Sequence, residues 1–203
     1  MTGDISTPEQ ISAQKRAMRA EVRERRGLLS QAQRDAAAAG IAAQLDELLA
    51  RTGATTITCY LSTVTEPGTR AFINAAMARG VRVLLPVTRG DGLLDWAVGR
   101  EDDQERVGLF GLAEPDGEVL GPMAADDADL LIIPASAVSA DGFRLGWGRG
   151  YYDKMIGSMA KVPPTYAVIY DAEFTEHVPV EAHDQRVTGA ITPTRIIDIA
   201  PEA

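Results

Sequence analysis

The feature that most constrains the fold is a set of short runs in which neighbouring residues are all apolar. Leu130 to Ile133 is the clearest of these runs, because no polar side chain alternates with the apolar ones. Successive side chains of a strand point to opposite faces, so such a strand needs a sheet covered on both sides. Further strands are predicted at 57–61, 81–87, 94–98, 165–170 and 194–199, with helical segments at 69–80 and after Gly150. We therefore expect an α/β fold with three α/β/α layers and a mostly parallel, Rossmann-like central sheet.

Two helices are predicted before the first strand. Thr7 and Gln10 fit a capping box around Pro8, so the first helix should run from there to about Arg26. Ser30 begins a second capping box, and Gly53 should end the second helix. We expect both helices to pack on the outside of the sheet and residues 1–203 to form one domain. The stretch 100–128, rich in Asp, Glu, Gly and Pro, is expected to be a long surface excursion.

Charge and hydropathy limit the partners. The formal net charge is -9 and the pI is near 4.7, which argues against a general nucleic-acid binder. The apolar runs are far shorter than the roughly 20 residues of a membrane span, and the N-terminus lacks the apolar core of a signal peptide. We expect a cytoplasmic monomer whose partners are small molecules. Cys59, the single cysteine, has apolar neighbours and is expected to be a buried thiol.

The stretch "GFRLGWGRGYYD" carries the strongest chemical signal. Gly146, Gly148 and Gly150 alternate before a predicted helix, so unhindered backbone N–H groups and a helix N-terminus can face one anion. Arg144 and Arg149 add guanidinium groups suited to phosphate oxygens. The spacing matches neither a Walker A loop nor a dinucleotide fingerprint. Glycine clusters also make ordinary turns, but the arginines and aromatic residues favour a phosphate-binding loop.

Neighbouring residues extend this site. Tyr151 and Tyr152 offer flat faces for a heteroaromatic ring, although one of them can equally be a core residue. Asp153, and Asp184 after His183, are carboxylates that Mg²⁺ would accept beside a phosphate, and Asp153 alone can also be an ordinary helix-end charge.

Four basic residues, which can also be a solvated face, share one side of the first helix: Lys15, Arg19, Arg23 and Arg26. If this helix packs over the glycine loop, Lys15 and Arg19 can clamp outer phosphates. Glu66 follows a strand end, where it can accept hydrogen bonds from ring N–H groups or serve as a helix N-terminal charge.

Taken together, these segments resemble the 5-formyltetrahydrofolate cyclo-ligase family, also called 5,10-methenyltetrahydrofolate synthetases. "RLGWGRGYYD" is similar to the family signature R-L-G-x-G-x-G-[YF]-Y-D, and Lys15 with Arg19 fits its K-x-x-[LM]-R pattern. Supporting matches are "YLS" followed by Glu66, "DLLIIP" before the loop, and His183-Asp184. The resemblance extends from the Lys15 helix to the last predicted strand.

The resemblance implies an ATP- and Mg²⁺-dependent cyclisation of 5-formyltetrahydrofolate to 5,10-methenyltetrahydrofolate, with release of ADP and phosphate. It assigns the folate substrate to Leu61, Glu66, Tyr151 and Tyr152, Mg²⁺ to Asp153 and Asp184, and catalysis to Arg144 and Tyr152. It assigns ATP to the following residues: Lys15, Arg19, Arg144, Leu145, Gly146, Trp147, Gly148, Arg149, Gly150, Tyr151 and Tyr152.

The chain departs from the family pattern beside the signature, at Ala135, Ser139 and Thr188. Two other function classes remain as alternatives. One is a folate- or nucleotide-binding paralogue without activity, and the intact Lys15, Arg19, Arg144 and Asp153 count against it. The other is a sugar-phosphate isomerase or CoA-transferase-like enzyme, which has no use for the basic helix or the Tyr-Tyr-Asp cluster.

Overall fold

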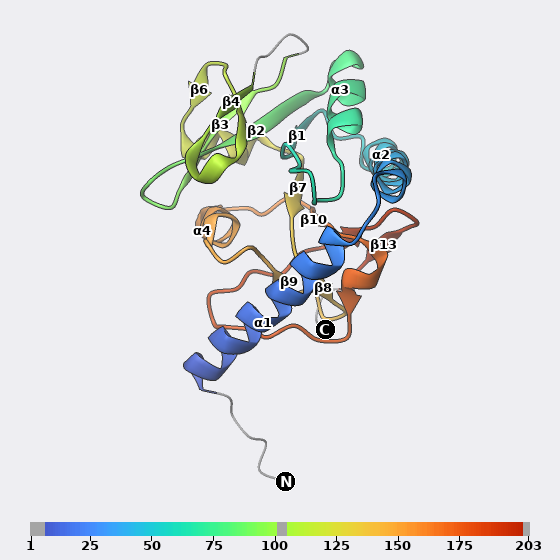
Figure 1. The fold of residues 1–203 in the computed structure, drawn as a ribbon. Helices are drawn as coiled ribbons and strands as arrows, with labels where there is room; N and C mark the ends of the chain where they lie inside the picture. The colour runs from blue at the N-terminus through green and yellow to red at the C-terminus, as the bar shows by residue number, and fades with distance from the viewer. Residues whose placement is uncertain (1–6, 101–104, 201–203) are drawn as a thin grey trace.

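The computed structural model describes residues 7–100 and 105–200 (Figure 1). Its largest sheet has the strand order β13-β12-β10-β7-β1-β2-β3-β6, counted over these described residues. The five strands from β12 to β2 pair in parallel, while β13 and β3 run antiparallel to their neighbours at the two sides. The strands are β1 (Thr56–Thr58), β2 (Arg82–Thr88), β3 (Leu94–Val98), β6 (Val119–Leu120), β7 (Leu130–Pro134), β10 (Thr165–Val168), β12 (Gly189–Ile191) and β13 (Ile196–Asp198). The predicted fold class is confirmed.

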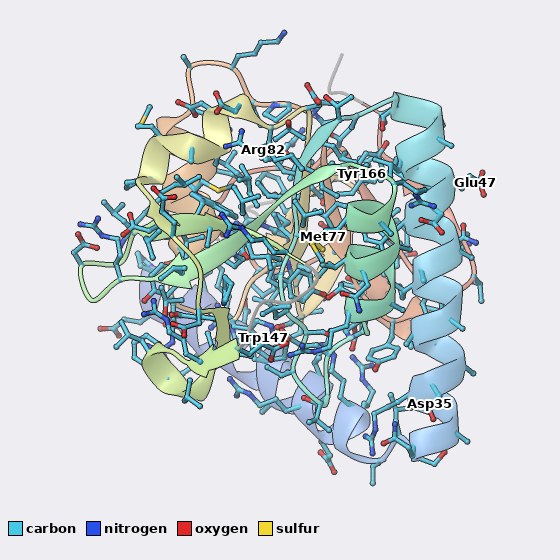
Figure 2. All side chains as sticks on the ribbon, turned by 90° about the horizontal axis from the view of Figure 1, so that it is seen from above. Asp35, Glu47, Met77, Arg82, Trp147 and Tyr166 are labelled. Carbon is cyan, nitrogen blue, oxygen red and sulfur yellow. The ribbon has the colours of Figure 1, made fainter. Side chains whose placement is uncertain are left out.

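The two faces of this sheet are covered by different helices. Leu130 and Ile132 of β7 pack towards α2 (Gln31–Thr52) and α3 (Arg70–Ala78), whereas Leu131 and Ile133 pack towards α4 (Tyr151–Ser158). Figure 1 shows α2 and α3 on one side of the strands and α4 on the other. In Figure 2 the exposed Glu47 lies on the outer side of α2, while Met77 of α3 lies inward against the core. The run of apolar residues in β7 therefore serves both outer layers, as its sequence predicts.

The first helix, α1 (Pro8–Gly27), does not pack on the large sheet as expected. Its Met18 contacts a second, smaller sheet with the order β11-β8-β9, made of β8 (Ala137–Ser139), β9 (Arg144–Leu145) and β11 (Phe174–Thr175). Both predicted capping boxes are present, at Thr7 and at Ser30, and Gly53 ends α2 in the left-handed conformation with φ 65°. Local chemistry therefore predicts the helix ends correctly, while the surface on which α1 packs differs from the expectation.

The stretch 100–128 is more structured than the sequence indicates, and its residues 101–104 lie outside the described part. It contains β4 (Glu105–Val107) paired with β5 (Ala113–Pro115), and the short 3-10 helices η1 (Leu109–Gly111) and η2 (Pro122–Asp127). A third, η3 (Asp171–Glu173), precedes β11. The expected surface excursion holds for the exposed β4 and is wrong for Glu114 and Ala125, which are buried. No helix in the described residues is long and apolar enough to cross a membrane.

Candidate active site

A pocket of about 660 Å³ opens where β1, β2 and β7 end. Its walls come from α1, from the segment after β1, from the β2–β3 region, from residues 110–114, from the glycine loop and from the segment 181–184. Ligands of parallel α/β sheets bind at this carboxyl edge, so the position agrees with the topology. All the sequence-predicted site residues line the pocket: Lys15, Arg19, Leu61, Glu66, Arg144, Leu145, Gly146, Trp147, Gly148, Arg149, Gly150, Tyr151, Tyr152, Asp153 and Asp184.

The glycine loop connects β9 to α4 and contains two left-handed residues, Gly148 with φ 95° and Gly150 with φ 68°. Gly150 is the N-cap of α4, so the loop delivers a helix N-terminus into the pocket. Arg19 Nε donates to the Gly146 carbonyl oxygen at 2.7 Å, and a Cβ on Gly148 would lie 3.2 Å from the Arg19 guanidinium. Helix α1 therefore packs over the loop, which was the condition for Lys15 and Arg19 to act there.

Cations gather around this loop in different environments. Arg144 is 4% exposed and donates from Nη2 to Asp153 Oδ1 at 2.9 Å. Burial, and then the nearby Arg23, lower the pKa of Arg19 from its usual value. The Arg149 guanidinium stacks on the Phe110 ring, with Cζ 3.2 Å from the ring centroid. A guanidinium that has lost hydration gains more from a phosphate oxygen than one in bulk water does.

The two predicted metal carboxylates are each paired with a cation. Lys15 Nζ lies 2.5 Å from Asp184 and 2.8 Å from Glu181, and Asp153 accepts from Arg144. Ligand atoms of Glu181, His183 and Asp184 lie within 4.8 Å of one another. Lys15 thus contacts the carboxylates of this group in the structure.

The two tyrosines of the signature differ. The Tyr151 hydroxyl donates to the Arg89 carbonyl oxygen at 2.9 Å, which ties α4 to the turn after β2. Burial, followed by the neighbouring Cys59 and Glu66, raises the pKa of Tyr152, so its phenol keeps its proton at neutral pH. The protonated phenol of Tyr152 can donate a hydrogen bond.

Tyr60, Glu114 and Phe110 are among the wall residues that sequence reasoning missed. Tyr60 is 4% exposed, and its hydroxyl has no hydrogen-bond partner among the described residues. Glu114 is buried and accepts from the Thr88 backbone N–H at 2.8 Å and from its hydroxyl at 2.5 Å. Phe110 has φ 63°, the one positive φ of a non-glycine residue in the described chain. Of these three residues, Tyr60 alone had a usable signal, since it directly precedes Leu61 at a strand end.

The departures from the family pattern have structural roles of their own. The Ser139 hydroxyl donates to the Phe143 carbonyl oxygen at 3.1 Å within the β8–β9 hairpin that leads into the loop. Thr188 Oγ1 accepts from the Thr165 backbone N–H at 2.9 Å, which ties the start of β12 to β10. The Ala135 carbonyl oxygen accepts from Arg26 Nη2 at 2.9 Å.

Comparison with known sequences agrees with this geometry. Residues 11–193 match the 5-formyltetrahydrofolate cyclo-ligase family. The chain is similar to the 5-formyltetrahydrofolate cyclo-ligase of Mycolicibacterium smegmatis, with 35% identity over 145 residues, which cover 69% of this chain and 74% of the relative. It is also similar to the enzyme of that name from Escherichia coli, with 28% identity over 146 residues, covering 70% and 79% of the two chains.

Solved structures support the same fold. The 5,10-methenyltetrahydrofolate synthetase of Aquifex aeolicus superposes with a TM-score of 0.77 at 23% identity, over 93% of this chain and 94% of that one. The corresponding protein from Mycoplasma pneumoniae gives a TM-score of 0.70 at 19% identity, over 87% and 97% of the two chains. At these identities the likeness shows a shared fold.

Proposed function

The chain belongs to the 5-formyltetrahydrofolate cyclo-ligase family of enzymes, and from that premise we propose that it converts 5-formyltetrahydrofolate to 5,10-methenyltetrahydrofolate at the expense of ATP. One observation carries the proposal. A single pocket combines a glycine loop surrounded by cations with a wall of aromatic side chains and a carboxylate, so a polyphosphate and a flat organic ring can meet there.

The phosphate part of the proposal rests on α1 and the glycine loop. Arg19 and Arg144 flank Gly146, and Gly148 and Gly150 leave their backbone N–H groups unhindered by a Cβ. Charge-assisted hydrogen bonds from guanidinium groups and the N-terminus of α4 would hold the triphosphate of ATP. Lys15 would contribute a further ammonium group from the same helix.

The folate part rests on the opposite wall. Leu61 and the tyrosines supply apolar and aromatic surface, and Glu66 supplies a carboxylate that can accept from the N–H groups of a reduced pterin. Glu66 already accepts a hydrogen bond from the Thr63 backbone N–H at 2.8 Å, which fixes one of its oxygens. Its other oxygen accepts from the Trp147 indole N–H at 3.1 Å, so the carboxylate is held in one orientation.

The donor set also fits Mg²⁺, the usual partner of ATP. Asp153 and Asp184 are carboxylates in the pocket, and Glu181 stands beside Asp184. Oxygen ligands of this kind suit Mg²⁺, which would neutralise charge on the triphosphate. Because Lys15 and Arg144 now pair with these carboxylates, the two cations would become available to the phosphates when a metal ion takes their place.

In the proposed reaction the formyl oxygen attacks the γ-phosphorus of ATP and ADP leaves. N10 of the folate then attacks the activated formyl carbon and loses its proton, and the carbon–oxygen bond breaks to release phosphate. The overall balance is one ATP consumed, and one methenyl product, one ADP and one phosphate formed. Arg144 would stabilise the transferring phosphoryl group and Tyr152 would donate a hydrogen bond, so catalysis depends on positioning and charge and needs no protein nucleophile.

The test is an assay with purified protein, 5-formyltetrahydrofolate and MgATP, followed by the absorbance of the methenyl product. We expect product only when ATP and Mg²⁺ are both present, and none after chelation. If folate binds and no product forms, the binding-only alternative holds. A sugar-phosphate isomerase or CoA-transferase activity in the same preparation would instead place the chain in another enzyme class.

A further inference from the structure

Arg26 is a buried cation that the proposed reaction does not use. It is 1% exposed, and its Nε and Nη2 donate to the two carboxylate oxygens of Glu173, each at 2.7 Å. Nη2 also donates to the Ala135 carbonyl oxygen at 2.9 Å. Glu173 is itself 2% exposed and accepts from the Tyr170 backbone N–H at 2.8 Å. Burying both charges is costly, so this ion pair needs a reason beyond stability.

The guanidinium of Arg26 also stacks with aromatic rings. Its Cζ lies 5.1 Å from the Trp147 ring centroid and 5.4 Å from that of Tyr170. Arg23 contributes a second cation over Trp147 at 5.4 Å. Cation–π contacts of this kind are strongest when the cation has lost its water, as Arg26 has. Trp147 is labelled in Figure 2, and its contacts with Arg23 and Arg26 place the indole ring against α1.

Trp147 in turn reaches the folate side of the pocket. Its indole Nε1–H donates to Glu66 Oε1 at 3.1 Å, while Glu66 Oε2 accepts from Thr63. The side chain of this glycine-loop residue therefore orients the carboxylate assigned to folate, although its backbone belongs to the phosphate loop. A chain of contacts leads from Glu173 through Arg26 and Trp147 to Glu66.

We propose that Arg26 and Glu173 are positioning residues that hold the Trp147 indole, so that its N–H fixes the Glu66 carboxylate for the folate substrate. This inference rests on the proposed function, since it takes Glu66 to contact folate. A rotationally fixed carboxylate loses less conformational freedom on binding than a mobile one does. The contacts from Glu173 through Arg26 and Trp147 to Glu66 affect the binding of folate, and they leave the cations around the phosphate loop unchanged.

Two sets of variants test the link. Trp147→Phe keeps an aromatic ring over Arg26 and removes the N–H. Arg26→Met with Glu173→Leu removes both buried charges together, so that no charge is left alone in the interior. Arg25→Met is the matched control, because it removes an exposed arginine from the neighbouring position of the same helix. Circular dichroism and melting curves establish that each variant is folded.

We expect Trp147→Phe and the double variant each to raise KM for 5-formyltetrahydrofolate about five- to tenfold, as the loss of a hydrogen bond to a charged group would. For the double variant, KM for ATP and kcat should stay within about twofold of wild type, as should all parameters of Arg25→Met. Combining the three substitutions should raise KM little further, because Arg26 acts through Trp147.

A binding measurement gives a readout independent of turnover. The chain has two tryptophans, Trp96 and Trp147, so Trp96→Phe leaves Trp147 as the single tryptophan, which can be excited selectively. In that background we expect 5-formyltetrahydrofolate alone to change the emission, and the added Arg26→Met/Glu173→Leu pair to weaken the apparent affinity by the same factor as KM.

Folded variants with unchanged folate KM and affinity would overturn the proposal, and so would equal losses for folate and ATP. If wild-type protein forms no methenyl product, the proposed function fails instead. The fluorescence titration then still shows whether Arg26 and Glu173 control folate binding.

Discussion

At Gly148 both the backbone conformation and a close contact in the pocket require glycine. Its φ of 95° is unfavourable for any side chain, and a Cβ would lie 3.2 Å from the Arg19 guanidinium. We predict that Gly148→Ala costs about 1–2 kcal/mol of stability from strain and also raises KM for ATP, because Arg19 is displaced. Steady-state kinetics and thermal melting measure the two effects.

The control is Gly53→Ala. Gly53 has a similar φ of 65° at the end of α2, and a Cβ added there would meet nothing within 4 Å. It should lose comparable stability and keep its kinetic constants. If the two substitutions changed KM for ATP alike, the contact between Arg19 and the loop would not matter for ATP.

Asp153 is the residue on which the metal proposal can be tested most directly. We predict that Asp153→Asn lowers kcat at least about tenfold, most severely at limiting Mg²⁺, and changes folate affinity less than about twofold. Asp126→Asn, an exposed substitution on η2, serves as the control. Turnover that is insensitive to the Asp153 substitution at low Mg²⁺ would contradict the metal role.

Cys59 gives a prediction about reactivity. Burial raises the pKa of its thiol to about 12, so at neutral pH almost no thiolate is present and the sulfur is also shielded. Iodoacetamide should leave native protein unmodified and label it readily in denaturant, as mass spectrometry would show. Rapid labelling of the native state would mean that the β1 region opens.

Residues of the site differed in how far sequence could identify them. The glycines and arginines of the loop form a dense local pattern, so Arg144 to Asp153 were found together. Tyr60 and Glu114 reach the pocket through long-range packing, and nothing in their immediate neighbours marks them as strongly. The pairing of Lys15 with Asp184 was missed because it joins residues 169 positions apart.

At the scale of elements, α2 meets the turn between β12 and β13 at one close contact. A Cβ on Gly40 would collide with the Pro193 carbonyl oxygen. Helix propensity alone favours alanine over glycine by about 1 kcal/mol, whereas overpacking against backbone costs about 1–3 kcal/mol. We therefore predict that Gly40→Ala lowers the melting temperature by a few degrees.

The neighbouring exposed Ala39 provides a comparison, since Ala39→Gly should lose about 1 kcal/mol through propensity only. Differential scanning calorimetry distinguishes the two cases. A stabilised Gly40→Ala variant would show that α2 can shift away from Pro193.

The ends of helices and strands were predicted correctly where a local sequence signal marks them. Capping boxes and Gly53 located the ends of α1 and α2, and β3 matched its predicted residues 94–98. The short strands β8, β9 and β11 were missed because two or three residues carry no periodicity. The packing of α1 was misjudged because its buried Lys15 and Arg26 are polar, so its inner face does not look apolar in sequence.

At the scale of the whole molecule, four of the five tyrosines share one behaviour. Burial is the leading cause that raises the pKa of Tyr60, Tyr152, Tyr166 and Tyr170, and for Tyr166 the value is about 12. Folded protein then keeps phenol protons that the unfolded chain loses near pH 10. Their contribution to stability is full below about pH 10 and is lost as the pH rises from there through the pKa of each tyrosine in the folded state, which for Tyr166 is about 12.

We predict that the tyrosinate absorbance of native protein rises well above pH 10, and that the same titration in concentrated urea has its midpoint near 10. Urea melts should show falling stability across this alkaline range. Coincident native and denatured titrations would mean that the tyrosines are solvated in the folded state.

The overall architecture was predictable because the strands of a sheet covered by helices on both faces are apolar on both sides. Leu130 to Ile133 imply two outer layers whatever their order, and the short connections limit the possible topologies. The antiparallel strands β13, β3 and β6 at the two sides of the sheet carry no such mark, since the sequence of a strand does not show in which direction its neighbour runs.

The contact between Lys15 and Asp184 also bears on how the protein is made. Lys15 of helix α1 leaves the ribosome more than 160 residues before Glu181 and Asp184 do. Until that segment emerges, Lys15 lacks the carboxylates that hold it in the finished protein, and the pocket lacks one of its walls. A nascent chain stalled before residue 181 would thus display its basic helix and glycine loop without the acidic segment that faces them. The pocket is therefore completed only after residues 181–184 have been synthesised.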